Sequence, residues 1–412
     1  MQRGGLCVRA STSTQAGALP RQKQDDSMTK SVPQDWDPHS PAARENQVAV
    51  YDDMRQRCPV AHSDAFGWSL FRHADVMHAL EDHATFSNAV SAHRSVPNGM
   101  DAPEHTEYRR IIEPYFSLDR MAALEPRCRA IAKEAVASLP RAGEIDVMAD
   151  FADEFALQAQ CAFLNWPVDL HRPLRDWTRK NHAATRSRDR KAMAAVAFEF
   201  DRHIRAVLDE RRAAGIKGSD IASELLREQI AERELTDEEI VSILRNWTVG
   251  ELATIAACIG ILMAFLAGHE ELQSRLRANP SLLPVAIDEI LRIESPLMTS
   301  RRIATCPVQV GERMIGTGER VTLMWGSANR DEHVFEDAAH FRLERDPGLN
   351  LLYGAGIHVC PGAPLARLEL RVLMEELLAA VAFTPSPTRP LIRAVHPASG
   401  FGTCPIQLRA LS

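Results

Sequence analysis

The feature that most constrains this chain is its apolar segment from Ile240 to Gly268. Apolar residues fall on nearly every side of a helix drawn through it, which is typical of a helix buried along its length. Thr236 and Glu239 have the spacing of a capping box, which predicts where this helix begins. The longest apolar run, Leu252 to Gly268, is interrupted and falls short of a membrane span. We therefore expect a helix through the middle of the protein and no membrane segment.

Composition is that of an ordinary globular protein, since 45% of the 412 residues are hydrophobic and 25% are charged. This is enough apolar material to bury a large core and enclose a cofactor. The formal net charge is -7, and no basic cluster of the kind that binds nucleic acid is present. We expect no nucleic-acid partner and no attraction to an anionic membrane surface.

The eight cysteines are scattered and form no CxxC pair, which argues against a zinc cluster or an iron–sulfur site. The N-terminus lacks the apolar region of a signal peptide. A disulfide framework is therefore not expected, and a reducing, cytoplasmic location is predicted. Residues 1–35 lack periodicity, which predicts a disordered tail, with Met28 as an alternative start. A single domain is expected over residues 36–412.

From about residue 40 onward the pattern is mainly helical. Besides the apolar segment, helices are predicted at about 122–139, from 147, and at 191–214, 281–294 and 365–381. Short β runs separated by glycines are predicted at 308–310, 314–315, 321–323 and 405–408. We expect a mainly α fold with small β-sheets.

One cysteine stands in a glycine-rich loop just before a predicted helix. The loop reads Tyr353-Gly354-Ala355-Gly356-Ile357-His358-Val359-Cys360-Pro361-Gly362. Glycines allow backbone N–H groups to turn toward the sulfur, and the positive end of the next helix favours a thiolate there. Because a metal ion would deprotonate such a thiol, Cys360 is a candidate metal ligand.

This loop resembles the haem-binding signature of the cytochrome P-450 superfamily, and Cys360 stands where that family has its axial thiolate. The resemblance runs from about residue 40 to residue 408. It implies the cytochrome P-450 fold and haem b (iron protoporphyrin IX) as the cofactor, bound by a thiolate that favours O–O cleavage. Tyr353 replaces the usual Phe, a change of similar shape.

A second motif carries the resemblance upstream of the loop. Glu289 and Arg292 are three residues apart on one helix face and match the family's ExxR helix. Arg345, at the end of the segment Phe341–Arg345, matches the third member of that network. The resemblance gives these three residues a structural role on the haem side of the core.

Four residues match the family's contacts to the haem propionates, which need cationic or donor partners. His105 and Arg109 are four residues apart on one helical face, and a solvated charged face is the alternative for this pair. Arg302 and His358 match two further propionate-binding positions.

The long apolar helix takes the place of the family's oxygen-binding helix, whose neighbouring acid and threonine relay protons. Counted from Gly250, those two positions hold Leu252 and Ala253 instead. Glu251 and Thr254 lie beside them, three residues apart, so they can share a face. Our hypothesis is that a local bulge lets these two serve as the catalytic pair. The alternatives are that water and substrate groups carry the protons, or that both residues are structural.

The substrate pocket follows from analogy with the family. Its candidate residues are mostly apolar: the segment from Val90 to Val96, Val249, Gly250, Leu297, Met298 and Phe401. Each of them could equally be a core residue. Together they favour a small, largely apolar organic substrate.

The predicted function is a soluble, bacterial-type haem-thiolate monooxygenase that activates dioxygen and hydroxylates or dealkylates such a substrate. The chain has no flavin or NAD fingerprint and no cysteine cluster. A separate ferredoxin and an NAD(P)H-dependent ferredoxin reductase are therefore expected as partners, docking near Cys360. The alternatives are a peroxygenase driven by hydrogen peroxide and a non-catalytic haem-binding sensor or carrier.

Overall fold

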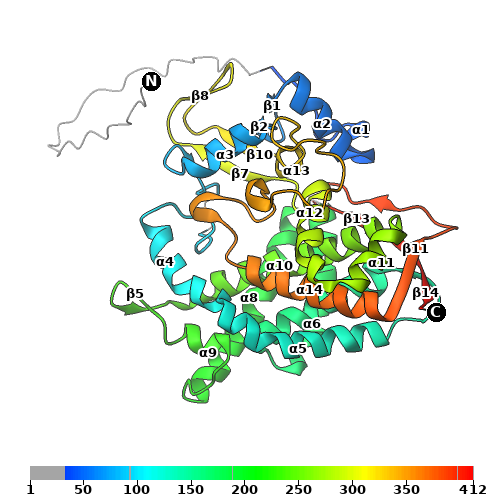
Figure 1. Cartoon of the computed structure of the whole chain (residues 1–412). Coiled ribbons are helices and arrows are strands. Elements are labelled where there is room, and N and C mark those ends of the chain that lie inside the picture. Colours follow the sequence, from blue (N-terminus) through cyan, green and yellow to red (C-terminus); the bar gives the residue numbers. More distant parts are fainter. Residues whose placement is uncertain (1–32, 92–93, 188, 397, 412) are drawn as a thin grey trace. The chain divides into compact units, whose positions relative to one another are not determined.

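The computed structural model describes residues 33–411, except 92–93, 188 and 397. Residues Gln34–Ser412 form one compact unit (Figure 1). The predicted tail, residues 1–35, lies almost wholly outside the described residues.

Helices make up most of the described part of the chain, in agreement with the predicted mainly α fold. In order, they are α1 (Pro41–Glu45), α2 (Gln47–Arg57), α3 (His73–Glu81), α4 (Glu104–Ile112), α5 (Leu118–Ala137), α6 (Asp153–Leu164), α7 (His171–Ser187), α8 (Arg190–Ala213), α9 (Ile221–Leu225), α10 (Asp237–Ala267), α11 (Glu270–Ala278), α12 (Leu283–Glu294), α13 (Trp325–Ala328) and α14 (Ala363–Ala380). The predicted helices end within a few residues of these bounds.

The strands form small, separate sheets. A five-stranded sheet has the order β1 (Val60–Ser63), β2 (Gly67–Leu70), β10 (Arg320–Leu323), β7 (Ser300–Ala304) and β3 (Phe86–Ser87), with only the β2–β10 pair parallel. A three-stranded antiparallel sheet has the order β11 (Val381–Pro385), β14 (Pro405–Ala410) and β4 (Gly143–Asp146). The two-stranded pairs are β5 (Gln229–Ile230) with β6 (Arg233–Glu234), β8 (Val308–Val310) with β9 (Arg313–Ile315), and β12 (Ile392–Arg393) with β13 (Phe401–Thr403).

Helix α10 begins at the predicted capping box. The backbone N–H of Glu239 donates to Thr236 Oγ1 (3.3 Å), and the Thr236 N–H donates to Glu239 Oε2 (2.8 Å). Among the described helices, α10 alone is long and apolar enough to cross a membrane, but 67% of its apolar window is buried inside the protein. It is therefore the core helix that the sequence predicts.

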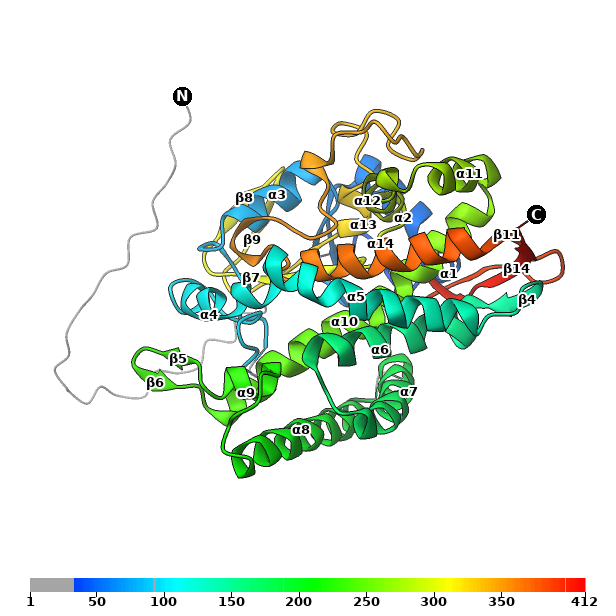
Figure 2. The same cartoon turned by 60° about the horizontal axis from the view of Figure 1, so that its bottom comes forward.

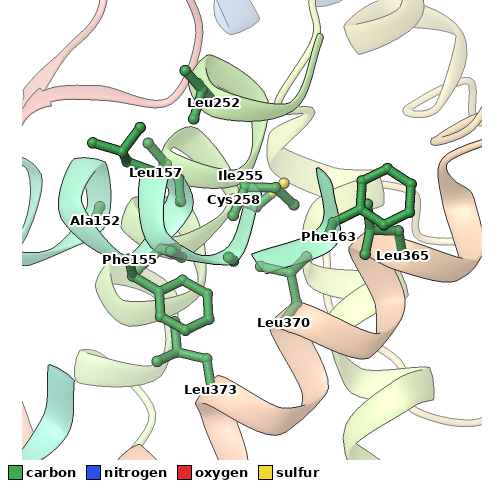
Figure 3. Packing of buried hydrophobic residues seen from close by; sticks show 14 of the residues in the cluster. Ala152, Phe155, Leu157, Phe163, Leu252, Ile255, Cys258, Leu365, Leu370 and Leu373 are labelled. Carbon is green, nitrogen blue, oxygen red and sulfur yellow. The ribbon is translucent and has the colours of Figure 1, made fainter. Parts of the chain in front are cut away.

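The core lies where α10 packs against α6, α12 and α14, and α5 covers α6 and α14 (Figure 2). Apolar side chains from α6, α10 and α14 point toward one another in this region (Figure 3). Examples are Phe155 of α6, Ile255 and Cys258 of α10, and Leu370 and Leu373 of α14, all buried. Because α14 follows the cysteine loop directly, this packing fixes the loop relative to α10.

Candidate active site

A cavity of about 580 Å³ lies between α10, the segment that joins α12 to β7, and the glycine-rich loop before α14. Its volume falls within the usual range for cofactor and ligand pockets. Cys360 is on its wall and is exposed to it. The residue that the sequence singles out as a metal ligand thus faces a cavity.

The loop that carries Cys360 has a shape that requires glycine. Gly356 has φ +67°, and a Cβ atom there would lie 2.3 Å from the carbonyl oxygen of Leu80 in α3. No side chain can replace glycine at such a contact without moving the backbone. The loop closes with a hydrogen bond from the Cys360 N–H to the Tyr353 carbonyl oxygen (2.8 Å). These contacts hold the sulfur in place before α14 begins.

The protein alone does not favour a thiolate at Cys360. Burial raises the pKa of its thiol, although hydrogen bonds from the backbone of Gly362 and Ala363 lower that pKa in part. The backbone amides thus favour a thiolate, as the sequence predicts, but burial outweighs them in the protein by itself. A bound metal cation reverses the balance, because a coordinating thiol loses its proton.

The predicted propionate contacts lie close together, and most line the cavity. Arg109, Arg302 and His358 are on its wall. His105 is not, but its ring stands against that of His358 with the centroids 4.1 Å apart. Arg109 also donates to the Val359 carbonyl oxygen (2.8 Å), which ties α4 to the cysteine loop. His105 and Arg109 are both buried, so they do not form a solvated charged face.

Three of these side chains lack the partners that buried polar groups normally have. Arg302 is buried, and no carboxylate of the described residues pairs with it; its hydrogen bonds go to Ser300 Oγ and the Arg301 carbonyl oxygen. Burial lowers its pKa to about 10. In the described residues, His105 Nδ1 and His358 Nε2 also have no hydrogen-bond partner. A buried cation with unused donors beside it fits an anionic group, and the carboxylates of haem supply two.

The two histidines stay neutral in this environment. Burial and, to a smaller extent, the nearby Arg109 lower the pKa of His105 to about 4 and that of His358 to about 3. A neutral imidazole donates one hydrogen bond to a carboxylate. These rings can therefore take part in binding a propionate without carrying a positive charge.

The structure brings Glu289, Arg292 and Arg345 together in one buried network. Glu289 accepts from Arg292 Nε (2.7 Å) and Nη2 (2.9 Å), and from Arg345 Nε (2.9 Å). Arg292 also donates to the carbonyl oxygens of Asn329 and Ala338. The network therefore joins α12 to the segments after α13, ahead of the cysteine loop.

Glu251 and Thr254 both line the cavity. Helix α10 is continuous from Asp237 to Ala267, so the expected local bulge is wrong and is not needed. Residues three apart share a face of a regular helix. Leu252 instead packs in the core, and Ala253 is exposed away from the described cavity wall.

Only some of the predicted substrate residues line the cavity. Gly250 and Leu297 line the cavity, whereas Val249 is 41% exposed and is not on its wall. Met298 is buried in a separate cluster, with Trp36, Tyr51, Phe66 and Phe71. Phe401 is buried in the main core. The predicted pocket is thus wrong at Val249, Met298 and Phe401; the side chains of the last two pack into core clusters instead.

In the segment from Val90 to Val96, Val90 is on the wall and Val96 is buried in the core. Sequence reasoning missed several polar wall residues, among them Gln160, Asn246 and Thr299. The sequence signal for Gln160 was weak, because Gln158 also interrupts the apolar stretch of α6; in the structure the Oε1 atom of Gln160 is buried without a described partner.

Residues 156–408 match the family described as Cytochrome P450. The chain is 30% identical over 343 residues to the cyclomarin C epoxidase CymV of Salinispora arenicola, covering 79% of this chain and 86% of that protein. It is 32% identical over 328 residues to nocardicin C N-oxygenase of Nocardia uniformis, covering 76% and 81%.

Solved structures agree with the sequence matches. The substrate-free structure of CYP109E1 from Bacillus megaterium superposes with a TM-score of 0.81 at 27% identity, covering 89% of this chain and 100% of that one. The mainly helical fold with small sheets is therefore the fold of that family. On these grounds the chain belongs to the cytochrome P450 family, whose members are haem-binding monooxygenases.

Proposed function

We propose that this chain is a haem-thiolate monooxygenase that inserts one oxygen atom of dioxygen into a small, largely apolar substrate, by hydroxylation or dealkylation. One observation carries the proposal: Cys360 shares a cavity wall with Arg109, Arg302 and His358. Cys360 would bind the haem iron through its sulfur, and the other three, with His105 behind them, would hold the propionates. When bound, haem supplies the iron at which dioxygen is activated.

Glu251 and Thr254 are the proposed groups that hold and move protons. Both line the cavity on one face of α10. Glu251→Gln should lower the product formed per electron pair, because an amide cannot release a proton as a carboxylic acid does. Glu238→Gln is the matched control, since it is exposed on the same helix. Unchanged coupling in Glu251→Gln would exclude the assignment.

The cavity wall supports a largely apolar substrate with a few polar contacts. Leu297, Ile255 and Leu291 are apolar, and Asn246 and Thr299 supply polar groups. Such a mixture orients a ligand through few hydrogen bonds and binds it mainly by burial. The named relatives are an epoxidase and an N-oxygenase, so family membership does not fix the reaction.

Electrons are proposed to come from a separate ferredoxin and its NAD(P)H-dependent reductase in the cytoplasm. The lack of a flavin or NAD fingerprint in the sequence supports this. The test is turnover with isotopically labelled dioxygen, a ferredoxin, a reductase and a set of apolar substrates. We expect one labelled oxygen atom in the product and a substrate-induced shift of the haem spectrum.

The same experiment separates the alternatives. Higher activity with hydrogen peroxide alone than with the redox chain would identify a peroxygenase. Absence of both a substrate-induced spectral shift and oxygen consumption would identify a haem-binding sensor or carrier.

A further inference from the structure

Two buried glutamates meet behind the cavity wall. Glu251 of α10 is 9% exposed and lines the cavity, and Glu369 of α14 is 0% exposed. Their carboxyl groups are within hydrogen-bonding reach of each other. Figure 3 shows the surrounding packing, in which the neighbouring Leu252 and Leu370 belong to the apolar core that α10 and α14 share.

Neither carboxyl finds another partner in the described part of the chain. Glu251 Oε1 and both carboxyl oxygens of Glu369 are buried and receive no hydrogen bond from an N–H or O–H group there. The two arginines nearest to Glu369 on α14 have other carboxylate partners: Arg367 pairs with Asp288, and Arg371 pairs with Glu125 and Glu375. Buried carboxylates are normally paired or hydrogen-bonded.

The ionisable groups that face the pair are acids as well. Cys128 of α5 raises the pKa of Glu369, and Glu251 raises the pKa values of Cys128, Cys258 and Cys360. No basic side chain is among the groups that shift the pKa of either glutamate. This differs from Glu375, two turns further along α14, which pairs with Arg129 and Arg371.

A contact between two carboxyl groups needs a proton, because two carboxylates are both acceptors and repel each other. Burial raises the pKa of Glu251. Burial and the charge of Glu251 together raise the pKa of Glu369 well above its usual value. Glu369 is fully buried, whereas Glu251 faces the cavity, so a charge on Glu369 would lose more hydration and Glu369 is the better holder of the proton.

We propose that Glu251 and Glu369 hold one proton between them at neutral pH, with the Glu369 hydroxyl donating to the Glu251 carboxylate. Glu369 is then a positioning residue that keeps a carboxylic acid directly behind the cavity wall. Should the proton move from Glu369 to Glu251 and on into the cavity, the pair is left with two carboxylates, and a proton from the solvent must replace it. Only this consequence for turnover rests on the proposed function; the shared proton is a property of the folded chain.

The direct test is infrared spectroscopy of the holoenzyme near neutral pH, in water and in heavy water. The wild type should show a protonated carboxyl C=O band that moves on deuteration. Glu369→Gln should remove that band, and Glu251→Gln should shift it. Glu375→Gln is the matched control on the same helix and should leave it in place. Identical carboxyl regions in wild type and Glu369→Gln would overturn the proposal.

Stability against pH gives a second, independent measurement. A glutamate whose pKa is raised in the folded state destabilises it as pH rises above 4.5, the usual value, toward the raised value. The unfolding equilibrium constant of the wild type should then grow relative to that of Glu369→Gln, by up to about tenfold per pH unit in this window. If the free energies of unfolding of the wild type and of Glu369→Gln changed with pH in the same way, the proposal of a shared proton would be contradicted.

Failure of this proposal is distinguishable from failure of the proposed function. The carboxyl band and the pH profile do not depend on which ligand binds the iron. A Glu369→Gln enzyme that keeps the thiolate-haem spectrum but loses coupling would support both proposals. If the band is lost with coupling unchanged, the pair exists but does not serve turnover.

Discussion

Glu289 and Arg292 are buried charges that, with the partly buried Arg345, find their partners within the chain. In the cavity wall, by contrast, the buried Arg302 has no carboxylate partner among the described residues, and His358 Nε2 has no hydrogen-bond partner there. Both regions have taken polar groups out of water, which costs free energy unless the groups are paired. In the Glu289 network the chain itself pairs the charges when it folds. In the cavity wall, the polar groups of Arg302 and His358 can be paired only by a bound ligand.

The difference assigns a role to each region from its hydrogen bonds. A closed network such as that of Glu289 fixes the chain and has no capacity for a ligand. An incomplete set of donors, as at Arg302, marks a place where an anion binds. The Glu251–Glu369 pair is a third case, since a proton rather than a ligand completes it.

The largest effect is expected when the closed network is broken. Glu289→Gln removes the charge that balances Arg292, which is fully buried. Loss of one partner of a buried ion pair typically costs about 3–5 kcal/mol. We expect a fall of that size in the free energy of unfolding, measured with a denaturant, together with a lower yield of folded protein.

The control for this change is Arg342→Gln, which removes one partner of an exposed pair with Glu336. Surface pairs contribute about 0–1 kcal/mol, so little change is expected. If Glu289→Gln were as mild as this control, the network would not be the structural element described above.

The second effect concerns the histidines, measured without haem. The pKa values of His105 and His358 in the folded protein, about 4 and about 3, lie below the usual 6.5. The unfolded chain therefore binds more protons below pH 6.5, and stability is lost as pH falls from that value. The free energy of unfolding should therefore fall steeply as the pH is lowered. His358→Phe should raise it by about 2 kcal/mol near pH 5.

Binding of haem should make the same profile shallower, because propionate carboxylates favour the protonated imidazole. An exposed histidine provides the control: His340→Gln should leave the slope as it is. Equal slopes with and without haem would place the anionic groups elsewhere.

The third effect separates cofactor binding from stability. Arg302→Leu removes a buried cation that has no carboxylate partner among the described residues, so the folded protein should lose little or no stability. Haem should dissociate about tenfold faster, equivalent to about 1.4 kcal/mol, as measured by transfer to a haem-free acceptor protein. Arg320→Leu, on the adjacent strand β10, should not change the rate. If Arg302→Leu lost much stability but kept haem normally, Arg302 would have a structural role and not a role in binding the cofactor.

Sequence reasoning was most successful where a local pattern decides the structure. The capping box at Thr236 and the bounds of α10 follow from spacing and apolar content, and the structure confirms both. The family and its fold followed from the glycine-rich loop at Cys360, and the comparisons confirm them. These features depend on residues that are close together in the chain.

The sequence was least informative where two distant segments decide the outcome. Met298 and Leu297 are adjacent and both apolar, yet one packs in the Trp36 cluster and the other lines the cavity. Glu369 has no motif around it, and only its contact with Glu251 across the helix interface shows its environment. The sole signal was an acid on a helix face that is otherwise apolar.

The central claim is that Cys360 supplies a thiolate to haem iron, and the spectrum of the reduced protein with carbon monoxide tests it most directly. The account predicts a Soret band at the long wavelength typical of thiolate-bound haem, which Cys360→Ala should abolish. A haem spectrum without that band, or a band that survives in Cys360→Ala, would contradict the claim.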